Sequence, residues 1–264
     1  MGFLLSSRNW ILVSHAFSPV VEGSTVIFHV GGHDRGALTA FDMATGNVRW
    51  SWNGDGPGYG SPIVATLGGT RQLVTITQGK LVGVDVSNGA LLWERPFVSG
   101  NFTNSITPIL YGQTVIAWGN GDPITAVTPT RRNNRWVAET AWENAELAGR
   151  LSNWVIARDM LFGLSTRNAG QYFAADAKTG KTLWTSEGRQ APQAAIQTAG
   201  DLVFSLENDG ELVVMRVTPA GGEVLRRYKV AEAEAGIGPT WTQPVISGNR
   251  IFIKDVNTLA LWTL

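Results

Sequence analysis

Hydrophobic residues of this chain occur in short runs rich in Val, Ile, Leu and Thr, and Gly-rich segments separate the runs. Runs of about four to eight such residues between turn-forming residues are typical of β-strands. Helical signals are weak, because only residues 139–151 and 230–235 are rich in Ala and Glu and neither has capping residues or an apolar stripe. The pattern therefore predicts an all-β protein built from many short strands.

One motif recurs along the chain with a regular period. Its strong copies are residues 38–50, 81–93 and 172–184, in which Gly follows Asp by four residues and Trp follows Gly by four. Weaker copies place Thr128, Arg216 and Trp262 at the position of the Asp. From Asp42 onward the six positions are spaced by 43, 43, 48, 40 and 46 residues. A period of about 40–45 residues indicates the blades of a β-propeller.

Turn chemistry explains the residue types of the motif. An Asp at the end of a strand accepts hydrogen bonds from backbone N–H groups of the turn, and a Gly takes the positive φ that the turn requires. The Trp then falls on the next strand, where its ring can be buried against a neighbouring sheet. We therefore interpret the Asp, Gly and Trp of each copy as structural residues.

Each period divides into four strands, which we call A to D. In the first period we expect strand A at residues 18–21, B at 24–30, C at 37–42 and D at 47–52. Short connections join strands A and B in every copy, as in β-hairpins. The last copy stops after strand C, and residues 6–13 resemble a strand D. We expect this N-terminal strand to complete the last blade and to close a ring of about six blades.

Composition and charge narrow the function classes. The chain has 264 residues, of which 44% are apolar and 16% charged, so it folds, and we treat residues 1–264 as one domain. Lys plus Arg and Asp plus Glu number 21 each without a basic run, which argues against nucleic acid as a partner. The absence of Cys excludes disulfides and thiolate metal sites. No apolar stretch approaches the roughly 20 residues of a membrane span, and residues 10–13 are too short for the core of a signal peptide.

The segment Ala-Phe-Asp-x-x-Thr-Gly-x-x-x-Trp of residues 40–50, with Ser-Pro at 18–19 and 61–62, resembles the pyrroloquinoline-quinone-like (PQQ-like) repeat. This repeat is found in quinoprotein dehydrogenases and in the lipoprotein of the Bam outer-membrane assembly machinery. The resemblance covers the chain from about residue 18 onward and implies a bacterial protein that is periplasmic or secreted, although the chain shows no clear signal peptide. Propellers of this family usually have eight blades, so a fragment of an eight-bladed propeller is the alternative to a ring of six.

Strand order predicts where a partner binds. In a meander of four strands the B–C and D–A connections lie on one side of the propeller, and the polar, irregular residues of this chain are concentrated there. Exposed Arg and Trp side chains are frequent hot spots of binding. The candidate binding residues are His33, Asp34, Arg35, Tyr59, Asn104, Trp142, Glu143, Arg167, Asn168, Arg189, Gln190 and Trp241.

Signals of catalysis are weak by comparison. His33 and Asp34 could form a general-base pair, but a solvated turn between glycines is the simpler interpretation. His29 lies within a predicted strand and is expected to be a hydrogen-bonded core residue. Residues 54–58 are rich in Gly, yet the Lys-Ser/Thr pair and the helix of a phosphate-binding loop do not follow them. We therefore assign no catalytic residue.

The resemblance also raises the question of a quinone. Quinoprotein dehydrogenases hold pyrroloquinoline quinone with Ca²⁺, Glu, Asn and Asp ligands, and adjacent cysteines. This chain has no Cys and no local cluster of such ligands, although Asp55, Glu143 and Asp209 stand in loops that a fold could bring together. We predict a monomeric, non-catalytic propeller without metal or cofactor that binds a protein partner or a small ligand. A quinoprotein-type oxidoreductase that uses pyrroloquinoline quinone and calcium is the alternative, and a scaffold in an envelope assembly complex is a third hypothesis.

Overall fold

The fold is that of an all-β protein, as the sequence pattern predicts. The computed structural model describes residues 17–32, 36–99, 104–120, 122–232, 240 and 242–263. Within these residues the chain forms six antiparallel sheets, five of four strands and one of three, and its single helical element is the 3₁₀ turn Arg167–Ala169. No helix in this part of the chain is long and apolar enough to cross a membrane.

Sheets 1 to 3 each contain four strands that are consecutive in the chain. Sheet 1 consists of β1 (Val20–Glu22), β2 (Thr25–Val30), β3 (Ala37–Asp42) and β4 (Val48–Trp52). Sheet 2 consists of β5 (Ile63–Leu67), β6 (Thr70–Ile76), β7 (Lys80–Asp85) and β8 (Leu91–Pro96). Sheet 3 consists of β9 (Ile109–Tyr111), β10 (Thr114–Ala117), β11 (Ile124–Arg132) and β12 (Arg135–Asn144).

Sheets 4 to 6 follow the same order, and the last of them has three described strands. Sheet 4 consists of β13 (Val155–Ala157), β14 (Met160–Ser165), β15 (Gln171–Asp176) and β16 (Thr182–Thr185). Sheet 5 consists of β17 (Ala194–Ala199), β18 (Leu202–Glu207), β19 (Glu211–Thr218) and β20 (Gly221–Lys229). Sheet 6 consists of β21 (Val245–Ser247), β22 (Arg250–Lys254) and β23 (Leu259–Thr263).

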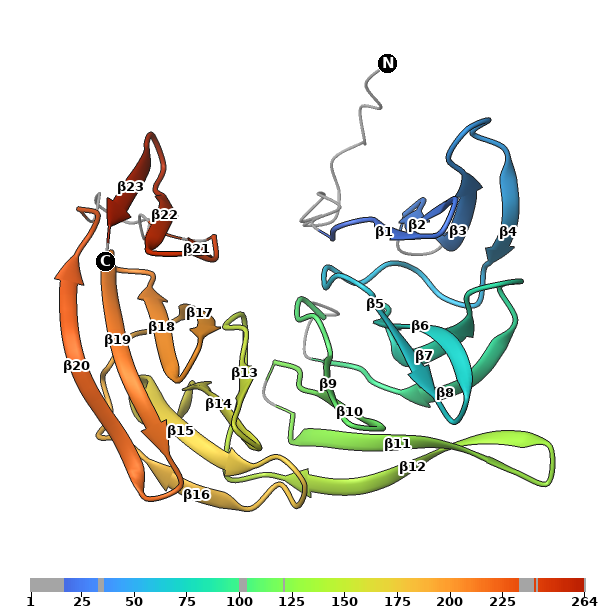
Figure 1. Ribbon diagram of the computed structural model, residues 1–264. Coiled ribbons are helices and arrows are strands. Elements are labelled where there is room, and N and C mark those ends of the chain that lie inside the picture. The colour runs from blue at the N-terminus through green and yellow to red at the C-terminus, as the bar shows by residue number, and fades with distance from the viewer. Residues whose placement is uncertain are drawn as a thin grey trace, which may run out of the picture.

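The sheets are the blades of a β-propeller. Figure 1 shows them side by side in an arc around a common axis, with the first strand of each sheet innermost and the last strand outermost. Sheets 1 and 6 are the two ends of this arc. The four strands of sheet 1 begin and end within two residues of the predicted bounds, so the prediction of four-stranded blades is confirmed. The N-terminal strand that we expect to close the ring, residues 6–13, lies outside the described residues.

The turn between the third and fourth strands is built by the motif Asp. In sheet 1 the Oδ1 atom of Asp42 accepts hydrogen bonds from the backbone N–H groups of Ala44 at 3.0 Å and Thr45 at 2.9 Å. Gly46 closes the turn with a φ of +73° and donates to the Asp42 carbonyl at 2.8 Å. The hydrogen bonds from Arg49 and from the turn hold the pKa of the Asp42 carboxyl at about 2. The local sequence is therefore sufficient to specify this turn.

Tryptophans of the outer strands β4, β12 and β16 join one sheet to the next, whereas Trp93 of β8 donates to Oε1 of Gln72 in its own sheet. In each of the three, the indole N–H donates to a carbonyl oxygen at the turn of the following sheet, and the ring lies against a Gly there, where a Cβ atom would come within about 3 Å of it. Only Gly fits so close to a buried ring. The three contacts of this kind are Trp50 with Val86 and Gly89, Trp142 with Ala177 and Gly180, and Trp184 with Thr218 and Gly222.

This docking predicts a position-specific cost of substituting Gly. In Gly180→Ala, the new Cβ would lie 2.2 Å from Cε3 of Trp142, at a residue whose φ is +73°. Overpacking and the left-handed backbone together should lower the free energy of unfolding by about 2–3 kcal/mol in urea denaturation. Gly23→Ala is the matched control, because φ is +59° and the methyl group meets no described atom within 4 Å, so only about 1 kcal/mol is expected. Equal losses in the two variants would contradict the docking.

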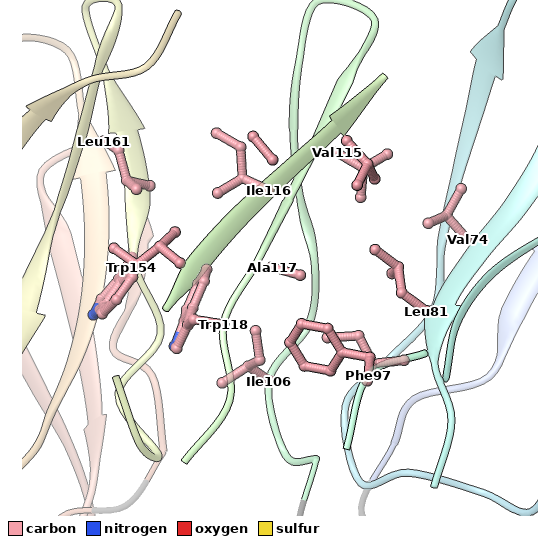
Figure 2. Packing of buried hydrophobic residues seen from close by; sticks show 14 of the residues in the cluster. Val74, Leu81, Phe97, Ile106, Val115, Ile116, Ala117, Trp118, Trp154 and Leu161 are labelled. Carbon is pink, nitrogen blue, oxygen red and sulfur yellow. The ribbon is translucent and has the colours of Figure 1, made fainter. Parts of the chain in front are cut away.

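Between the sheets, the aromatic and aliphatic side chains of the described residues form four clusters, the largest of which joins sheets 2, 3 and 4. Figure 2 shows side chains of sheets 2, 3 and 4 packed against one another around Trp118 and Trp154. The two indole rings are stacked with centroids 4.0 Å apart and planes inclined by 14°. Both residues are almost completely buried, and Trp154 also meets the ring of Phe173 edge-on at 4.8 Å. The core therefore holds neighbouring sheets in fixed positions, which in turn fixes the connecting loops.

Candidate functional site

Four of the predicted binding residues come together where two loops of sheet 4 meet. Arg167 and Asn168 lie in the 3₁₀ turn between β14 and β15, and Arg189 and Gln190 lie in the connection from β16 to β17. The backbone N–H of Arg189 donates to the Asn168 carbonyl at 3.0 Å, and that of Gln190 donates to the Gly170 carbonyl at 3.0 Å. Arg167, Asn168 and Arg189 are exposed. We call these four residues the arginine patch.

The backbone of the arginine patch is strained. Asn168, Ala169 and Arg189 have φ values of +50°, +60° and +61°, in the left-handed region that residues with a Cβ rarely adopt. Each such residue costs on the order of 1 kcal/mol, and Asn tolerates the conformation best. Strained backbone of this kind is often found where a protein binds something, because the strain holds side chains in position. Here two strained loops that carry exposed arginines are joined by the hydrogen bond from the Arg189 N–H to the Asn168 carbonyl.

Sheet 5 supplies a third arginine, which links the arginine patch to the protein interior. On β20, the Nη2 atom of Arg227 donates to Oε1 of Gln190 at 3.0 Å, and its Nη1 atom is 2.5 Å from Oε2 of Glu211. The same Nη1 atom lies 3.8 Å from Oε2 of Glu207, whose side chain is only 1% exposed. Arg227 thus bridges the surface and a buried acid.

Glu207 is this buried acid, and it lies between sheets 4 and 5. The hydroxyl of Tyr172, on β15, donates to Oε1 of Glu207 at 2.6 Å and also lies 2.8 Å from Oγ of Ser205. The Oε2 atom of Glu207 has no hydrogen-bond partner among the described residues. Burial raises the pKa of Glu207 to about 7, although the hydrogen bond from Tyr172 and the charge of Arg227 lower it. Burial and the nearby Glu207 also raise the pKa of Tyr172. Near neutral pH the Glu207 carboxyl can therefore gain or lose a proton.

Asn104 and Tyr59 belong to a different part of the propeller. Asn104 is 1% exposed, and its Nδ2 atom donates to the carbonyl oxygens of Thr77 at 2.9 Å, Phe97 at 3.0 Å and Gln78 at 3.1 Å. The backbone carbonyl of Asn104 accepts a hydrogen bond from the backbone N–H of Tyr59 at 2.7 Å. Asn104 therefore holds three loops of sheets 1 to 3 together, and its side chain is not at the surface where a partner would bind.

Two further predicted residues lie in a strand and not in a loop. Trp142 and Glu143 were expected in the connection after sheet 3, but both belong to β12, which continues to Asn144. Trp142 is 8% exposed and docks on sheet 4, so the prediction that it is a loop residue is wrong. Glu143 forms an ion pair with Arg95 of β8 at 2.9 Å. The remaining four candidates, His33, Asp34, Arg35 and Trp241, lie outside the described residues.

The carboxylates considered as calcium ligands do not form one site. Asp55 uses its Oδ2 atom to accept hydrogen bonds from Thr77 Oγ1 at 2.6 Å and Gly79 N at 2.8 Å. Glu143 faces Arg95 on sheet 2, and Asp209 caps the turn of sheet 5 by accepting the Glu211 N–H at 3.2 Å. Because the protein itself already uses these oxygens in different sheets, they do not fit the ligand set of a quinone-bound calcium ion. Among the residues that the structure describes, no group of three or more His, Cys, Asp or Glu side chains could hold a metal.

His29 behaves as a core residue. It is 5% exposed on β2, and its Nε2 atom lies 3.1 Å from the Asp55 carbonyl. The sequence-based expectation of a hydrogen-bonded core histidine is confirmed.

Comparison with known proteins identifies the family. A family model described as outer membrane protein assembly factor BamB, of the PQQ-like repeat type, matches residues 7–186 and 141–262. The chain belongs to this family of PQQ-like propellers. The resemblance inferred from the motif is therefore confirmed. No curated protein matches the sequence.

Solved structures show the same fold as this PQQ-like propeller at low sequence identity. BamB from Moraxella catarrhalis is 21% identical with a TM-score of 0.66, and the match covers 91% of this chain and 70% of that chain. The propeller domain of Cps50 (Swd1) from Myceliophthora thermophila is 15% identical with a TM-score of 0.62, over 97% and 85%. Quinohemoprotein alcohol dehydrogenase from Pseudomonas putida HK5 is 12% identical with a TM-score of 0.63, over 89% and 50%. This chain thus spans half the length of the dehydrogenase.

Sequence reasoning missed three residues of the site of this PQQ-like propeller. Glu207, Tyr172 and Arg227 lie on strands, whereas the polar pattern pointed to loops. One signal was present, because Glu207 ends the otherwise apolar strand Leu202–Glu207, in which Ser205 is the only other polar residue. An acid at the end of a buried strand needs a partner, and that partner comes from another sheet.

Proposed function

We propose that this PQQ-like propeller is a non-catalytic scaffold that binds a protein partner through the arginine patch. The observation that carries the proposal is the pair of strained loops, which are joined by the hydrogen bond from the Arg189 N–H to the Asn168 carbonyl and leave Arg167 and Arg189 exposed. A guanidinium group offers several N–H donors in a planar fork that suits carboxylates. The partner that fits best is therefore a protein surface with exposed Asp or Glu side chains.

The family supports this choice of function. Its model is described as an assembly factor for outer membrane proteins, which is a role in binding rather than in chemistry. By the same resemblance we propose a bacterial protein of the periplasm or the outer membrane. Two of the carboxylates considered as calcium ligands, Asp55 and Glu143, already bind Thr77 and Arg95 of this chain. This favours the scaffold over the oxidoreductase.

The test is the loss of partner binding on removal of the patch. A chain with Arg167→Ala and Arg189→Ala should keep its thermal unfolding temperature and lose about 30-fold or more in affinity, since hot-spot arginines contribute about 2 kcal/mol or more. The unaltered chain, immobilised, is used to capture proteins from a bacterial envelope extract, and the captured partner is then titrated against both chains.

A matched control removes the same charge elsewhere. Arg131 and Arg135 are exposed at the tip of the β11–β12 hairpin, far along the chain from the arginine patch. A chain with Arg131→Ala and Arg135→Ala should bind the partner as the unaltered chain does. Equal affinity of all three chains would contradict the assignment of the patch.

The oxidoreductase alternative has a direct test of its own. When pyrroloquinoline quinone and Ca²⁺ are added to the chain, we expect no absorbance of a bound quinone after gel filtration and no reduction of an electron-accepting dye with alcohol substrates. The appearance of both signals would reverse the choice in favour of a quinoprotein.

A further inference from the structure

The hairpin of β11 and β12 in sheet 3 departs from the turn motif of sheets 1, 2 and 4. Its turn reads Arg131-Arg132-Asn133-Asn134-Arg135, without the Asp and Gly of the motif. The last pair of the ladder joins Arg132 to Arg135, and Asn133 and Asn134 between them have φ values of +47° and +65°. Positive φ at both central residues is typical of the tight type I′ turn, whose twist matches that of two paired strands. The tip of this hairpin therefore has a defined shape.

The hairpin extends beyond the rest of sheet 3 as a ribbon of two strands. β10 pairs with β11 only as far as Val115 and Val127, whereas β11 and β12 remain paired as far as Arg132 and Arg135. Figure 1 shows the far ends of β11 and β12 at the outer margin of the propeller, away from β9 and β10. The tip is thus accessible to a partner that the other strands of sheet 3 do not touch.

Trp136 fixes the ribbon against sheet 2. Its ring lies over Gly68, in the turn between β5 and β6, where an added Cβ atom would be 2.9 Å from Cη2 of the indole. The backbone N–H of Gly68 also donates to Oε1 of Gln113, at the start of β10, at 2.9 Å. These contacts hold the base of the ribbon, so its charged tip keeps its position relative to the propeller.

The ribbon concentrates positive charge that the protein itself does not neutralise. Residues 124–138 contain three arginines and no Asp or Glu. Arg131, Arg132 and Arg135 are all exposed, and in the described part of the chain only Arg132 has an ion pair, with Glu139 at 2.9 Å. Arg132 and Arg135 lie directly opposite each other on the two strands, and like charges in this position destabilise a hairpin. An anionic partner would offset this repulsion.

The size of the tip favours an anionic membrane surface over an acidic protein as this partner. A stable protein interface covers about 800 Å² and 20–30 residues on each side, whereas the ribbon beyond β10 offers only residues 129–137. Attraction to an anionic lipid surface requires no such area, because each Arg near the surface strengthens binding about fivefold. Val137 is 40% exposed on the same face as Arg135, and apolar surface beside basic residues suits the bilayer interface.

We propose that Arg131, Arg132 and Arg135 at the tip of the β11–β12 hairpin bind the phosphate groups of an anionic membrane surface. Three arginines together strengthen such binding about 100-fold, which gives a reversible contact. The inference goes beyond the proposed scaffold function and does not rest on it. In a four-stranded meander the turn between the third and fourth strands lies on the side opposite the connections that carry the arginine patch. A chain bound to a membrane by this hairpin therefore leaves the patch free for a protein partner.

The test measures binding to lipid vesicles by cosedimentation. The unaltered chain should bind vesicles of phosphatidylcholine with about 30% phosphatidylglycerol at least about tenfold more tightly than vesicles of phosphatidylcholine alone. A chain with Arg131→Ala and Arg135→Ala should lose about 25-fold in affinity for the anionic vesicles. Absence of binding by the unaltered chain, or equal binding by the altered chain, would overturn the proposal.

A matched control removes the same charge from the equivalent turn of sheet 4. Lys178 and Lys181 are exposed between β15 and β16, and the charge of Lys178 acts on the carboxylate of Asp176 beside it. A chain with Lys178→Ala and Lys181→Ala should change its affinity for the anionic vesicles by about twofold or less. A loss as large as that caused by the hairpin substitutions would mean that net charge and not the hairpin decides binding, which would overturn the proposal.

A second altered chain separates charge from the shape of the guanidinium group. Arg131→Lys with Arg135→Lys should keep the affinity for the anionic vesicles within about threefold, because the attraction of a membrane surface depends on charge. A loss as large as that of the two alanine substitutions would indicate recognition by the planar fork of Arg, as a protein partner provides. That result would also overturn the proposal.

Salt dependence tests the unaltered chain, so it requires no variant to fold. An increase from about 50 to about 300 mM salt should weaken binding to the anionic vesicles at least about tenfold, since ions screen exposed charges. Binding that salt does not weaken would contradict the proposal. If Arg131→Ala with Arg135→Ala loses more affinity for soluble poly-glutamate than for the vesicles, the hairpin binds an acidic protein instead and the proposal fails. None of these assays contains the protein partner of the arginine patch, so the two proposals stand or fall separately.

Discussion

Trp154→Ala is expected to lower the free energy of unfolding by about 4 kcal/mol, because burial, ring stacking and a hydrogen bond are lost together. Trp154 is 2% exposed, stacks on Trp118 at 4.0 Å and donates from Nε1 to the Leu164 carbonyl at 3.0 Å. Its ring lies between sheets 3 and 4 (Figure 2), in the cluster of buried side chains that the two sheets share. Urea denaturation at neutral pH measures the loss.

The size of this effect should depend on burial and not on the residue type. Trp262→Ala serves as the control, because Trp262 is 38% exposed on β23 and should cost about 1 kcal/mol or less. Trp154→Phe should recover about half of the loss, since a ring remains against Trp118 and the N–H donor does not. Similar losses for Trp154→Ala and Trp262→Ala would show that the core between sheets 3 and 4 is not as tightly packed as described.

Glu207→Gln is expected to stabilise the protein by about 3 kcal/mol at pH 8 and to change its stability little near pH 4. The folded protein raises the pKa of Glu207 from 4.5 to about 7, so the folded state holds a proton that the unfolded state releases. Stability therefore falls as the pH rises from about 4.5 to 7, by about 1.4 kcal/mol for each pH unit between these two pKa values. Gln keeps the shape of the side chain and carries no charge, so this fall should disappear.

Several neighbouring groups act on the pKa of Glu207 in addition to burial. Arg227 attracts the carboxylate and Tyr172 donates to it, which lowers the pKa, but burial, together with repulsion from Asp209 and Glu211, raises it more. Unfolding curves at about pH 4.5, 6 and 8 test this balance. Glu223→Gln is the control, because Glu223 is an exposed residue of β20 that pairs with Arg216 at 3.2 Å and should change stability by less than about 0.5 kcal/mol at each pH. Destabilisation by Glu207→Gln at pH 8 would mean that the ion pair with Arg227 outweighs burial.

The sequence predicted the part of the candidate site that lies in loops. Arg167, Asn168, Arg189 and Gln190 were expected on one side of the propeller because strand order places their connections there, and the structure brings these four residues together. Trp142 was placed wrongly, because the pattern did not show that β12 continues to Asn144. The end of a strand depends on hydrogen bonds to its neighbour, and these cannot be read from composition.

The repeat, the turns and the family are determined by the sequence itself, since Asp42 and Gly46 form their turn from contacts within five residues. Only the tertiary structure decided that Glu207 is buried against Tyr172 and that Arg227 connects it to the surface. Tyr172 and Arg227 lie 35 and 20 positions from Glu207 in the chain, so the local sequence does not show these contacts. Burial is a property of the neighbouring sheet. Local chemistry therefore specifies each blade, whereas the packing of blade against blade gives an ordinary Glu its raised pKa.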